Sequence, residues 1–587
     1  MIFGKHINRY YLKYWYLFLL GIIALIAVDY VQLLLPEILG RIVNNIQIYG
    51  TMEWVEIKEV VIQVLFIGVI IFAGRFLWRL TLIRAGFLIE ADMRKDMFVH
   101  AEKMSVRYFQ EQKVGALMAL FTNDLETIEN VLSDGTIFLV DAFFLGGMAL
   151  IKMLISNWIL GLIAIIPLAI LVGCGGIVGK VMSKKYEERQ EAYENMSDFA
   201  QENFTGLSVI KAFVKEAHEI REFSRINRHN KKVNVEFVRY GVILDILIDV
   251  LVYSVIVIIM ALGGYFVFQG DGNFIAGDVT EFIGYFNTIV WPMLALAQII
   301  NMRSRGRTSL KRVSELLDEK VEILDRLPAE MSGIRGEFQF NHFSFIYPGA
   351  KEYALKDLNF TIRKGETIGV VGKIGSGKST FVNIFLHLYN VEENTLLVDG
   401  VDFMRVPIQL LRDEIGYVPQ DNFLFSDLVR KNITFAKDAA SEEEMIHAAE
   451  FADIDENIRG FRDGYDTLIG ERGTTLSGGQ KQRISIARAI LKDPSVLILD
   501  DAVSAVDIRT EEKILKNIAR ERKGKTTIIV ASRISTVQQA DRILVLSNGE
   551  VEAFASHQEL LEISPTYRRM AELQTLEKEM EGNAWQH

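Results

Sequence analysis

Long apolar stretches dominate the first 305 residues of this chain and restrict what those residues can fold into. Six of them approach the length of about 20 residues that an α-helix needs to cross the hydrocarbon core of a bilayer. They cover residues 14–35, 60–80, 136–155, 158–178, 241–268 and 282–300. The sequence therefore predicts six membrane-spanning helices in the first half of the chain.

The sequence after residue 305 lacks such long apolar stretches, so we divide the chain into two parts. At 587 residues it is too long for a single hydrophobic core, and the long apolar stretches all precede residue 305. We expect an all-α transmembrane domain over 1–305, a linker over 306–335 and an α/β domain over 336–587. With a net charge of −11 and no basic block, the chain is not expected to bind nucleic acid.

Basic residues indicate which connections between the spans face the cytoplasm. They follow the second, fourth and sixth spans, whereas the opposite connections are acidic or uncharged. Because Lys and Arg are enriched in cytoplasmic loops, both chain ends and the second half of the chain are expected in the cytoplasm. The basic residues are Arg79, Arg84, Arg94, Lys95, Lys103, Arg107, Lys180, Lys184, Lys185, Arg189, Arg303, Arg305 and Arg307.

The two long inner connections, 81–135 and 179–240, mix charged and apolar residues at helical spacing. This pattern is typical of helices that continue out of the membrane. It breaks at 105–115 and at 205–216, where each pair of helices is expected to reverse direction. From the residues alone, each connection is either a solvated helical hairpin or an elbow that contacts another domain.

A glycine-rich loop in the second half follows an apolar run at 367–371 and precedes a predicted helix at 381–388. Glycines let backbone N–H groups turn inward toward phosphate, while Lys378 reaches the outer phosphates and the Ser379 hydroxyl suits Mg²⁺. The alternative is a surface turn that matches by chance, which the flanking strand and helix disfavour. The predicted nucleoside triphosphate site consists of Gly372, Lys373, Ile374, Gly375, Ser376, Gly377, Lys378, Ser379 and Thr380.

Further polar motifs lie next to strand-like segments. Tyr347 offers an aromatic face for an adenine ring, although an ordinary edge strand is the alternative. Gln420 follows a strand-like run at 415–418, and the apolar run 495–499 ends in Asp500 and Asp501. The segment 470–483 lies between them, and 504–507 follows them. Within 470–483, a short motif precedes a helix rich in Ile and Ala and comprises Leu476, Ser477, Gly478, Gly479 and Gln480.

The order and spacing of these motifs resemble the ATP-binding cassette of ABC transporters. Six spans ahead of one cassette look like an ABC exporter half-transporter, and the resemblance covers nearly the whole chain. It implies ATP and Mg²⁺ as ligands. It also implies a second half-transporter chain as partner, because in that family each ATP lies between one chain's Walker motifs and the other chain's signature. The segments 105–115 and 205–216 then correspond to coupling helices, the second of which usually docks on the partner's cassette.

The same resemblance assigns roles to individual residues. Lys378 and the loop amides hold phosphate, Ser379 and Gln420 ligate Mg²⁺, and Asp500 orients the metal through water. The positions of Gln420, Asp501 and Ser532 are those that act on the attacking water and the outer phosphate. The signature residues act instead on nucleotide bound by the partner, where a helix N-terminus stabilises the outer phosphate; they are Ser477, Gly478, Gly479 and Gln480.

Two positions depart from the family pattern. Asp501 stands where Glu is usual, so its carboxylate is one methylene shorter, and Ser532 stands where His is usual. Drift explains one such change, but two in one nucleotide site indicate a degenerate site that holds ATP and hydrolyses it slowly. Because the signature is intact, the chain resembles the degenerate-site subunit of heterodimeric bacterial multidrug ABC exporters. A homodimer is the alternative.

Acidic side chains inside the spans are costly in lipid and favour a cavity. Aromatic side chains inside the spans more often serve helix packing, but they can also bind cationic, amphipathic ligands. We expect export of hydrophobic or amphipathic compounds, multiple drugs among them, across a bacterial plasma membrane. A lipid or peptide exporter is one alternative, and an ATP-gated channel or regulatory subunit is another. The candidate substrate contacts are Asp141, Asp245, Asp249, Phe286 and Trp291.

Overall fold

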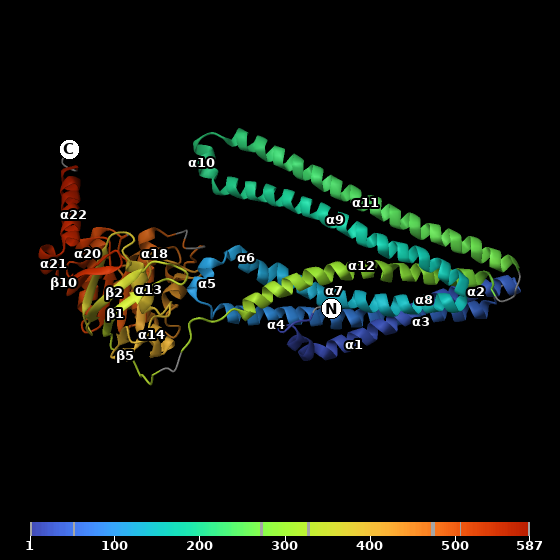
Figure 1. Ribbon diagram of the computed structural model, residues 1–587, viewed down its shortest axis with the longest axis horizontal. Helices are drawn as coiled ribbons and strands as arrows, with labels where there is room; N and C mark the ends of the chain where they lie inside the picture. The colour runs from blue at the N-terminus through green and yellow to red at the C-terminus, as the bar shows by residue number, and fades with distance from the viewer. Residues whose placement is uncertain are drawn as a thin grey trace. The chain divides into compact units, whose positions relative to one another are not determined.

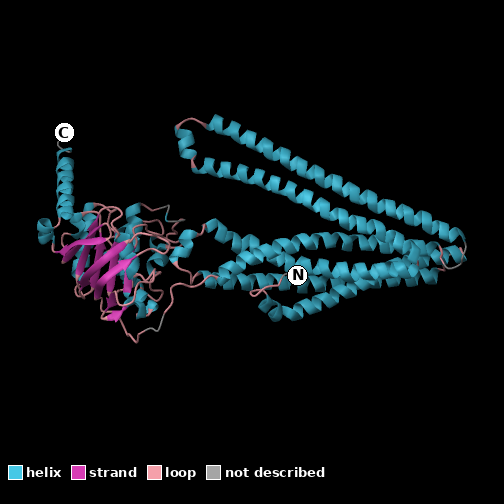
Figure 2. Cartoon of the chain, viewed as in Figure 1, coloured by secondary structure: helices cyan, strands magenta, loops and turns pink. Residues whose placement is uncertain are grey.

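The computed structural model describes residues 3–50, 53–269, 274–325, 329–470, 473, 476–504 and 506–584, except the side chains at 168–169, 171–180, 244, 297 and 577–584. The chain forms two compact units. One combines Met1–Glu102 with Gln112–Glu319, and the other combines Lys103–Glu111 with Lys320–His587. The first unit is helical, whereas the strands lie in the second (Figure 2).

Long helices build the first unit (Figure 1). Among the described residues, five segments are long and apolar enough to cross a membrane: Asn8–Tyr49, Trp54–Ala101, Val114–Ser156, Glu216–Gln269 and Ala276–Asp318. Five predicted spans are therefore confirmed as helices of membrane length. The predicted span 158–178 lies in α9 (Trp158–Thr205), partly at side chains outside the described ones.

Several of these segments consist of consecutive helices joined by π-helical turns. The pieces are α1 (Asn8–Gln32), α2 (Leu34–Tyr49), α3 (Trp54–Trp78), η1 (Arg79–Ile83), α4 (Arg84–Ala101), α6 (Val114–Ala119), η2 (Leu120–Asp124), α7 (Leu125–Val140), η3 (Asp141–Leu145), α8 (Gly146–Ser156), α11 (Glu216–Gln269) and α12 (Ala276–Asp318).

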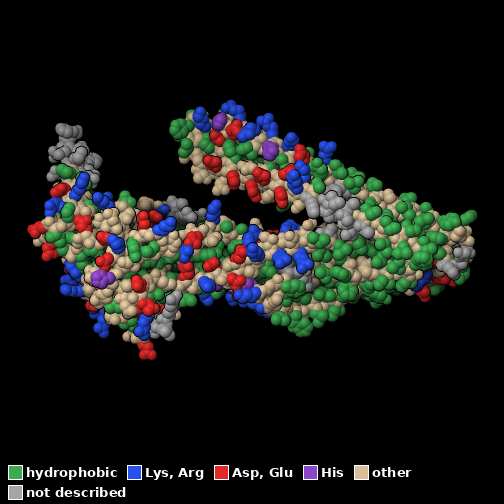
Figure 3. All heavy atoms as spheres, in the orientation of Figure 1, with side chains coloured by type: hydrophobic (Ala, Val, Ile, Leu, Met, Phe, Trp, Pro, Cys, Tyr) green, Lys and Arg blue, Asp and Glu red, His purple; other side chains and the backbone are tan. Residues whose placement is uncertain are grey.

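Apolar side chains cover much of the helical unit's surface. In the segment Trp54–Ala101, only 6% of the most apolar stretch is buried, which leaves the remaining side chains of that stretch for lipid. Figure 3 shows hydrophobic side chains gathered along the helices, whereas charged side chains gather on the hairpin of α9 and α11 near α10. This division matches a surface that passes from hydrocarbon into water.

Both predicted elbows contain a short helix. In the second unit, α5 (Val106–Glu111) follows Ser105, whose Oγ donates a hydrogen bond to Glu322 Oε2 at 2.8 Å. In the first unit, α10 (Leu207–Ala212) joins α9 to α11 and buries none of its residues. The chain reverses within both segments as expected. Their role as coupling helices stays a prediction.

The last helix of the first unit is longer than expected. Although the domain boundary is predicted at residue 305, α12 continues to Asp318. Leu310, Val313 and Leu316 are buried on one side of it, and Ser309 Oγ donates to Asp124 Oδ1 at 2.6 Å. These contacts hold residues 306–318 in the helical unit, so the linker predicted at 306–335 begins too early. Residues 326–328 of that linker lie outside the described part.

The second unit contains two sheets. The antiparallel sheet has the order β2-β1-β4-β5, and the larger sheet has the order β10-β9-β3-β8-β7-β6. In the larger sheet, neighbouring strands are parallel except for β10 against β9. The strands are β1 (Phe338–Phe345), β2 (Leu355–Ile362), β3 (Thr367–Gly372), β4 (Leu396–Val398), β5 (Val401–Asp402), β6 (Ile415–Val418), β7 (Val496–Asp500), β8 (Thr526–Val530), β9 (Arg542–Ser547) and β10 (Glu550–Ala555).

Helices follow most strands of the larger sheet. Because parallel strands end at the same edge, the loops after β3, β6, β7 and β8 come together there. The helices of this unit include α13 (Lys378–Phe385), α14 (Ile408–Glu414), α15 (Val429–Thr434), α16 (Glu442–Phe451), α17 (Asp455–Arg459), α18 (Gly478–Leu491), α19 (Ile508–Glu521), α20 (Ile534–Val537), α21 (His557–Ile563) and α22 (Pro565–Ala584).

An aromatic cluster packs α13 against the antiparallel sheet. The Phe340 side chain is 1% exposed. Its ring stacks on Phe360 at 4.8 Å and on Phe381 at 5.5 Å between centroids. Since α13 begins at Lys378, this cluster fixes the helix that carries the end of the glycine-rich loop.

We expect Phe340→Ala to lower the free energy of unfolding of this unit by about 3–5 kcal/mol, because it removes a buried ring and leaves a cavity. Calorimetric unfolding of the purified full chain measures the change. Leu468→Ala is the control, since that side chain is 64% exposed. Equal shifts for both variants would contradict the packing role of Phe340.

Candidate functional site

The glycine-rich loop connects β3 to α13 and depends on backbone shapes that glycine permits. Gly375 has φ +81° and Gly377 has φ +100°, which side-chain-bearing residues rarely adopt. A Cβ on Gly377 would lie 2.8 Å from the Ala354 carbonyl oxygen, and one on Gly372 would lie 2.3 Å from that of Leu546. The loop therefore needs glycine for both its curvature and its close packing.

The Lys378 ammonium group lies inside this loop. Its Nζ donates hydrogen bonds to the carbonyl oxygens of Gly372, at 2.7 Å, and Lys373, at 3.0 Å. Burial lowers the pKa of Lys378, while the nearby Asp501 and Asp500 carboxylates act in the opposite direction. The Ser376 hydroxyl oxygen in the same loop is buried and has no hydrogen-bond partner among the described residues. The loop thus holds a cation and an unused polar atom, as a phosphate site requires.

A cavity of about 670 Å³ opens on this loop. It brings together predicted site residues from the ends of β3, β6, β7 and β8. They are Ile374, Gly375, Ser376, Gly377, Lys378, Ser379, Thr380, Gln420, Asp500, Asp501 and Ser532. Parallel strands therefore place motifs that are far apart in the sequence around one space.

Two consecutive carboxylates lie at the end of β7. Asp500 is 7% exposed, and burial together with the charge of Asp501 raises its pKa. Asp501 has φ +50°, its N–H donates to the Val530 carbonyl at 2.9 Å, and its own carbonyl accepts from Ser504 Oγ at 2.8 Å. This backbone is held on both sides, so the direction of the Asp501 side chain is restricted.

The Ser532 hydroxyl is engaged with that side chain. Ser532 Oγ donates to Asp501 Oδ1 at 3.2 Å. The two positions that depart from the family pattern are therefore in direct contact across the cavity.

Oxygen atoms in the cavity suit a magnesium ion. Mg²⁺ prefers a few oxygen ligands and is usually bound through one or two carboxylates together with phosphate oxygens. The predicted ligands Ser379, Gln420 and Asp500 all line the cavity. Burial and the neighbouring Asp501 charge raise the pKa of Asp500, and a divalent cation beside this carboxylate would favour its charged form.

The predicted adenine contact, Tyr347, is not among the residues that line this cavity. Its hydroxyl donates to Thr380 Oγ1 at 2.9 Å, and its ring packs edge-on against Phe345 and Tyr389. It therefore supports the first turn of α13. The adenine role of Tyr347 stays a prediction.

Sequence reasoning missed part of the cavity wall. Glu352, Tyr353, Ala354, Asn548 and Gly549 line it as well. Asn548 and Gly549 both have positive φ in the turn between β9 and β10. An Asn-Gly pair between strands is a strong hairpin signal and would have located this turn, although not its place beside the phosphate loop.

The signature residues do not line this cavity. Ser477 and Gln480 cap α18 reciprocally: Gln480 N donates to Ser477 Oγ at 3.3 Å, and Ser477 N donates to Gln480 Oε1 at 2.9 Å. A Cβ on Gly478 would meet no atom of the described residues within 4 Å, so this first residue of α18 leaves room for a close approach; Gly479, the next residue of the helix, is partly exposed. Residues 471, 472, 474, 475 and 505 of the neighbouring motifs lie outside the described part.

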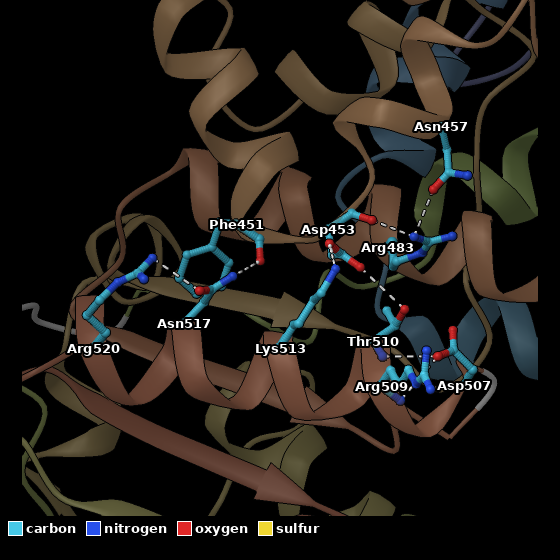
Figure 4. Close-up of polar contacts among 10 residues, drawn as sticks. All are labelled: Phe451, Asp453, Asn457, Arg483, Asp507, Arg509, Thr510, Lys513, Asn517 and Arg520. Atoms are coloured by element: carbon cyan, nitrogen blue, oxygen red, sulfur yellow. Dashed lines mark hydrogen bonds and ion pairs between the residues drawn. The ribbon is translucent and has the colours of Figure 1, made fainter.

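A polar network holds α18 in place (Figure 4). Arg483 Nε donates to the Gly479 carbonyl at 3.3 Å, and its NH1 donates to Asn457 Oδ1 at 3.0 Å and to the Asp453 carbonyl. The Asp453 carboxylate accepts from Lys513 Nζ at 3.1 Å. Because Lys513 belongs to α19, these contacts join the signature helix to the helix that follows 504–507.

The candidate substrate residues have different environments within the helical unit. Asp141 is 8% exposed and its Oδ2 accepts from Trp291 Nε1 at 3.2 Å. Phe286 is fully buried in the core between helices, so in this chain it contributes packing instead of an open surface. Asp245 and Asp249 are exposed on α11. The structure therefore joins Asp141 with Trp291 and does not bring the five residues together.

Sequence reasoning also missed a polar pocket between α7 and α12. Its volume is about 400 Å³. The lining residues are Thr127, Asn130, Val131, Asp134, Phe138, Gln298, Asn301, Met302 and Arg305. Amides, two opposite charges and apolar side chains in one pocket suit an amphipathic ligand.

Comparisons with known proteins agree with this arrangement. Residues 18–293 match the family model for the ABC transporter transmembrane region, and residues 355–504 match the model for the ABC transporter itself. The chain is 34% identical over 583 residues to the Bacillus subtilis (strain 168) protein named "Probable multidrug resistance ABC transporter ATP-binding/permease protein YheI", covering 99% of each chain. It is also 34% identical over 491 residues to the "ATP-dependent lipid A-core flippase" of Syntrophus aciditrophicus (strain SB), covering 83% of this chain and 81% of that one.

The fold agrees with a solved structure of a bacterial Atm1-family ABC exporter with ATP bound. The TM-score is 0.77 at 25% sequence identity, and the match covers 95% of this chain and 98% of the other. Together with the phosphate loop, the carboxylates after β7 and the membrane-length helices, these matches identify the family. The chain belongs to the ABC transporters, as a transmembrane region fused to an ATP-binding cassette that couples ATP hydrolysis to transport.

Proposed function

We propose that this chain is one subunit of an ATP-driven exporter that moves hydrophobic or amphipathic compounds, multiple drugs among them, out of a bacterial cell. The observation that carries the proposal is the phosphate-loop cavity in the same chain as helices of membrane length. The name of the similar YheI protein refers to multidrug resistance, which supports this substrate class. The proposal includes a cytoplasmic location for both chain ends and the cassette, because ATP is available there.

The nucleotide site of this chain is proposed to be degenerate. Asp501 carries a shorter carboxylate than the usual Glu, and its Oδ1 accepts a hydrogen bond from Ser532 at 3.2 Å. That contact occupies one of the two carboxylate oxygens that would polarise the attacking water. We expect MgATP to be held here by Lys378, Ser379, Gln420 and Asp500, with slow hydrolysis.

A second chain with a complete catalytic site is the proposed partner. Ser477 and Gly478 lie apart from the cavity of their own chain, and the start of α18 is open to an approaching phosphate. This placement supports a site shared between two chains. A homodimer would pair two slow sites, so a heterodimer agrees better with a transporter that turns over.

The substrate path is proposed to include the α7–α12 pocket and the Asp141–Trp291 pair. The carboxylates suit positive charge and the apolar side chains suit hydrocarbon, so an amphipathic cation fits better than a purely apolar compound. Because the chain is similar to a protein named as a lipid A-core flippase, a lipid is the second candidate substrate.

Transport assays distinguish these candidates. In inside-out membrane vesicles that contain the chain and its partner, we expect ATP-dependent accumulation of the fluorescent cation ethidium against its gradient. Asp134→Asn should reduce uptake at low ethidium concentration, whereas Glu352→Gln, in the cassette, should not act on ethidium affinity. Movement of a labelled phospholipid without ethidium would favour a lipid exporter. Flow only down the gradient would favour a channel.

The degenerate site generates a gain-of-function prediction. The purified single chain should bind ATP and hydrolyse it slowly, and the double variant Asp501→Glu/Ser532→His should raise the hydrolysis rate by about 10²-fold or more. Phosphate release assays measure the rate. Asp501→Asn/Ser532→His is the matched control, because it supplies the imidazole without a base. Fast turnover by the unmodified chain would refute the degenerate-site proposal.

The shared site predicts opposite effects for two variants in the assembled transporter. Gly478→Asp places negative charge where backbone must approach phosphate, so hydrolysis and export should be lost while photolabelling by 8-azido-ATP at this chain's own phosphate loop persists. Lys378→Ala should weaken that labelling and leave part of the hydrolysis. Lys351→Ala, an exposed lysine outside the cavity, is the control. Loss of labelling with hydrolysis intact in Gly478→Asp would exclude a shared site.

A further inference from the structure

The C-terminal helix α22 contacts the segment that contains Ser532. Gln574 of α22 uses both ends of its side-chain amide: its Oε1 accepts from Ile534 N at 2.8 Å, and its Nε2 donates to the Ser532 carbonyl at 3.1 Å. The backbone partners fix the amide orientation, since only the oxygen accepts and only the NH₂ group donates. The amide therefore bridges two residues on either side of Arg533.

The bridged segment reaches directly into the nucleotide cavity. Ser532 lines the cavity, and its Oγ donates to Asp501 Oδ1 at 3.2 Å. Gln574 is thus connected to the carboxylate at the end of β7 through one residue. A shift of this segment would change the distance between the hydroxyl and the carboxylate.

Helix α22 is itself anchored near its start. Tyr567 is fully buried, and its hydroxyl lies 2.7 Å from His557 Nδ1. Ser564 Oγ donates to Glu552 Oε1 of β10 at 2.6 Å. Gln574 lies about two helical turns beyond Tyr567, so the anchored helix holds the amide at a fixed place.

The opposite side of the same segment is held by α19. Glu511 is buried, and its Oε1 accepts from Thr536 Oγ1 at 2.5 Å. Its Oε2 lies 3.7 Å from Arg533 NH1. Helices α19 and α22 therefore both contact the segment 532–536. Gln574 provides the hydrogen bond to the Ser532 carbonyl.

We propose that Gln574 is a positioning residue for the nucleotide site, which sets the place of the Ser532 hydroxyl between Asp501 and bound ATP. In this proposal the C-terminal helix α22 contributes to the geometry of the nucleotide site. The inference concerns ATP held by this chain's own phosphate loop. It does not depend on the substrate or on whether the second chain is identical.

Gln574→Leu tests the proposal, because leucine has a similar size and forms neither hydrogen bond. A cavity of about 770 Å³ adjoins Gln574 and Ile534, so the replacement is not forced into a tight space. In the purified full-length transporter, release of fluorescent MANT-ATP from this chain's phosphate loop should become about three- to tenfold faster. Thr575→Ala is the matched control, since among the described residues its hydroxyl donates to the Ala571 carbonyl within α22, and it should leave release unchanged.

A double-variant cycle separates positioning from general weakening. If Gln574 acts through the Ser532 hydroxyl, Ser532→Ala and Gln574→Leu should each speed release, and the double variant should release ATP no faster than the faster single variant. Unchanged release in Gln574→Leu, or effects that multiply in the double variant, would overturn the proposal. Gln574→Glu keeps the acceptor for Ile534 N but loses the donor to the Ser532 carbonyl, so it replaces Gln574→Leu if the leucine variant does not assemble. Faster release of ATP is expected for this variant as well. Unchanged release would overturn the proposal.

Discussion

The close approach of three backbone segments around the phosphate loop is the constraint on which the cassette depends. The loop at Gly377 and the β9–β10 turn at Gly549 both approach the Ala354 carbonyl, where added Cβ atoms would lie at 2.8 and 2.9 Å. Gly549 N donates to the Ser376 carbonyl at 3.2 Å, and Lys356 N donates to the Gly549 carbonyl at 2.7 Å. A side chain at either glycine would separate these segments, so the curvature of the loop and the register of the sheet edge depend on each other.

This constraint explains why the order of strands matters more than the order of motifs along the chain. β3 lies between β8 and β9, and β7 lies next to β8, so the loop, Asp501 and Ser532 emerge at one edge. The contact between Ser532 and Asp501 then follows from strand neighbours and requires no proximity in sequence. The C-terminal helix reaches the same edge through Gln574, which extends the site to the far end of the described chain.

The sequence predicted what local pattern and spacing can encode. Apolar length located five of the spans, and the glycine-rich loop with Lys378 marked the phosphate site because its chemistry is contained in nine consecutive residues. Contacts between segments that are distant in the sequence could not be predicted. Gln574 looks like any polar helix residue, and nothing near Phe286 indicates that its ring is buried between helices. The sequence did not predict the end of α12 correctly. The continuous apolar run of the last span stops near residue 300, but the helix continues with buried residues on one face at 310–316.

Charge balance in the cavity argues that nucleotide and metal enter together. Asp500 and Asp501 are adjacent, and burial together with the charge of Asp501 raises the pKa of Asp500. Lys378 is the nearby cation that faces them, and its Nζ is occupied by two loop carbonyls. A triphosphate alone would add several negative charges beside two carboxylates in a partly buried space, where such repulsion is strong. Ser379, Gln420 and Asp500 would hold a divalent cation in this cavity, and its charge would offset this repulsion, while Lys378 would supply a positive charge to the outer phosphates.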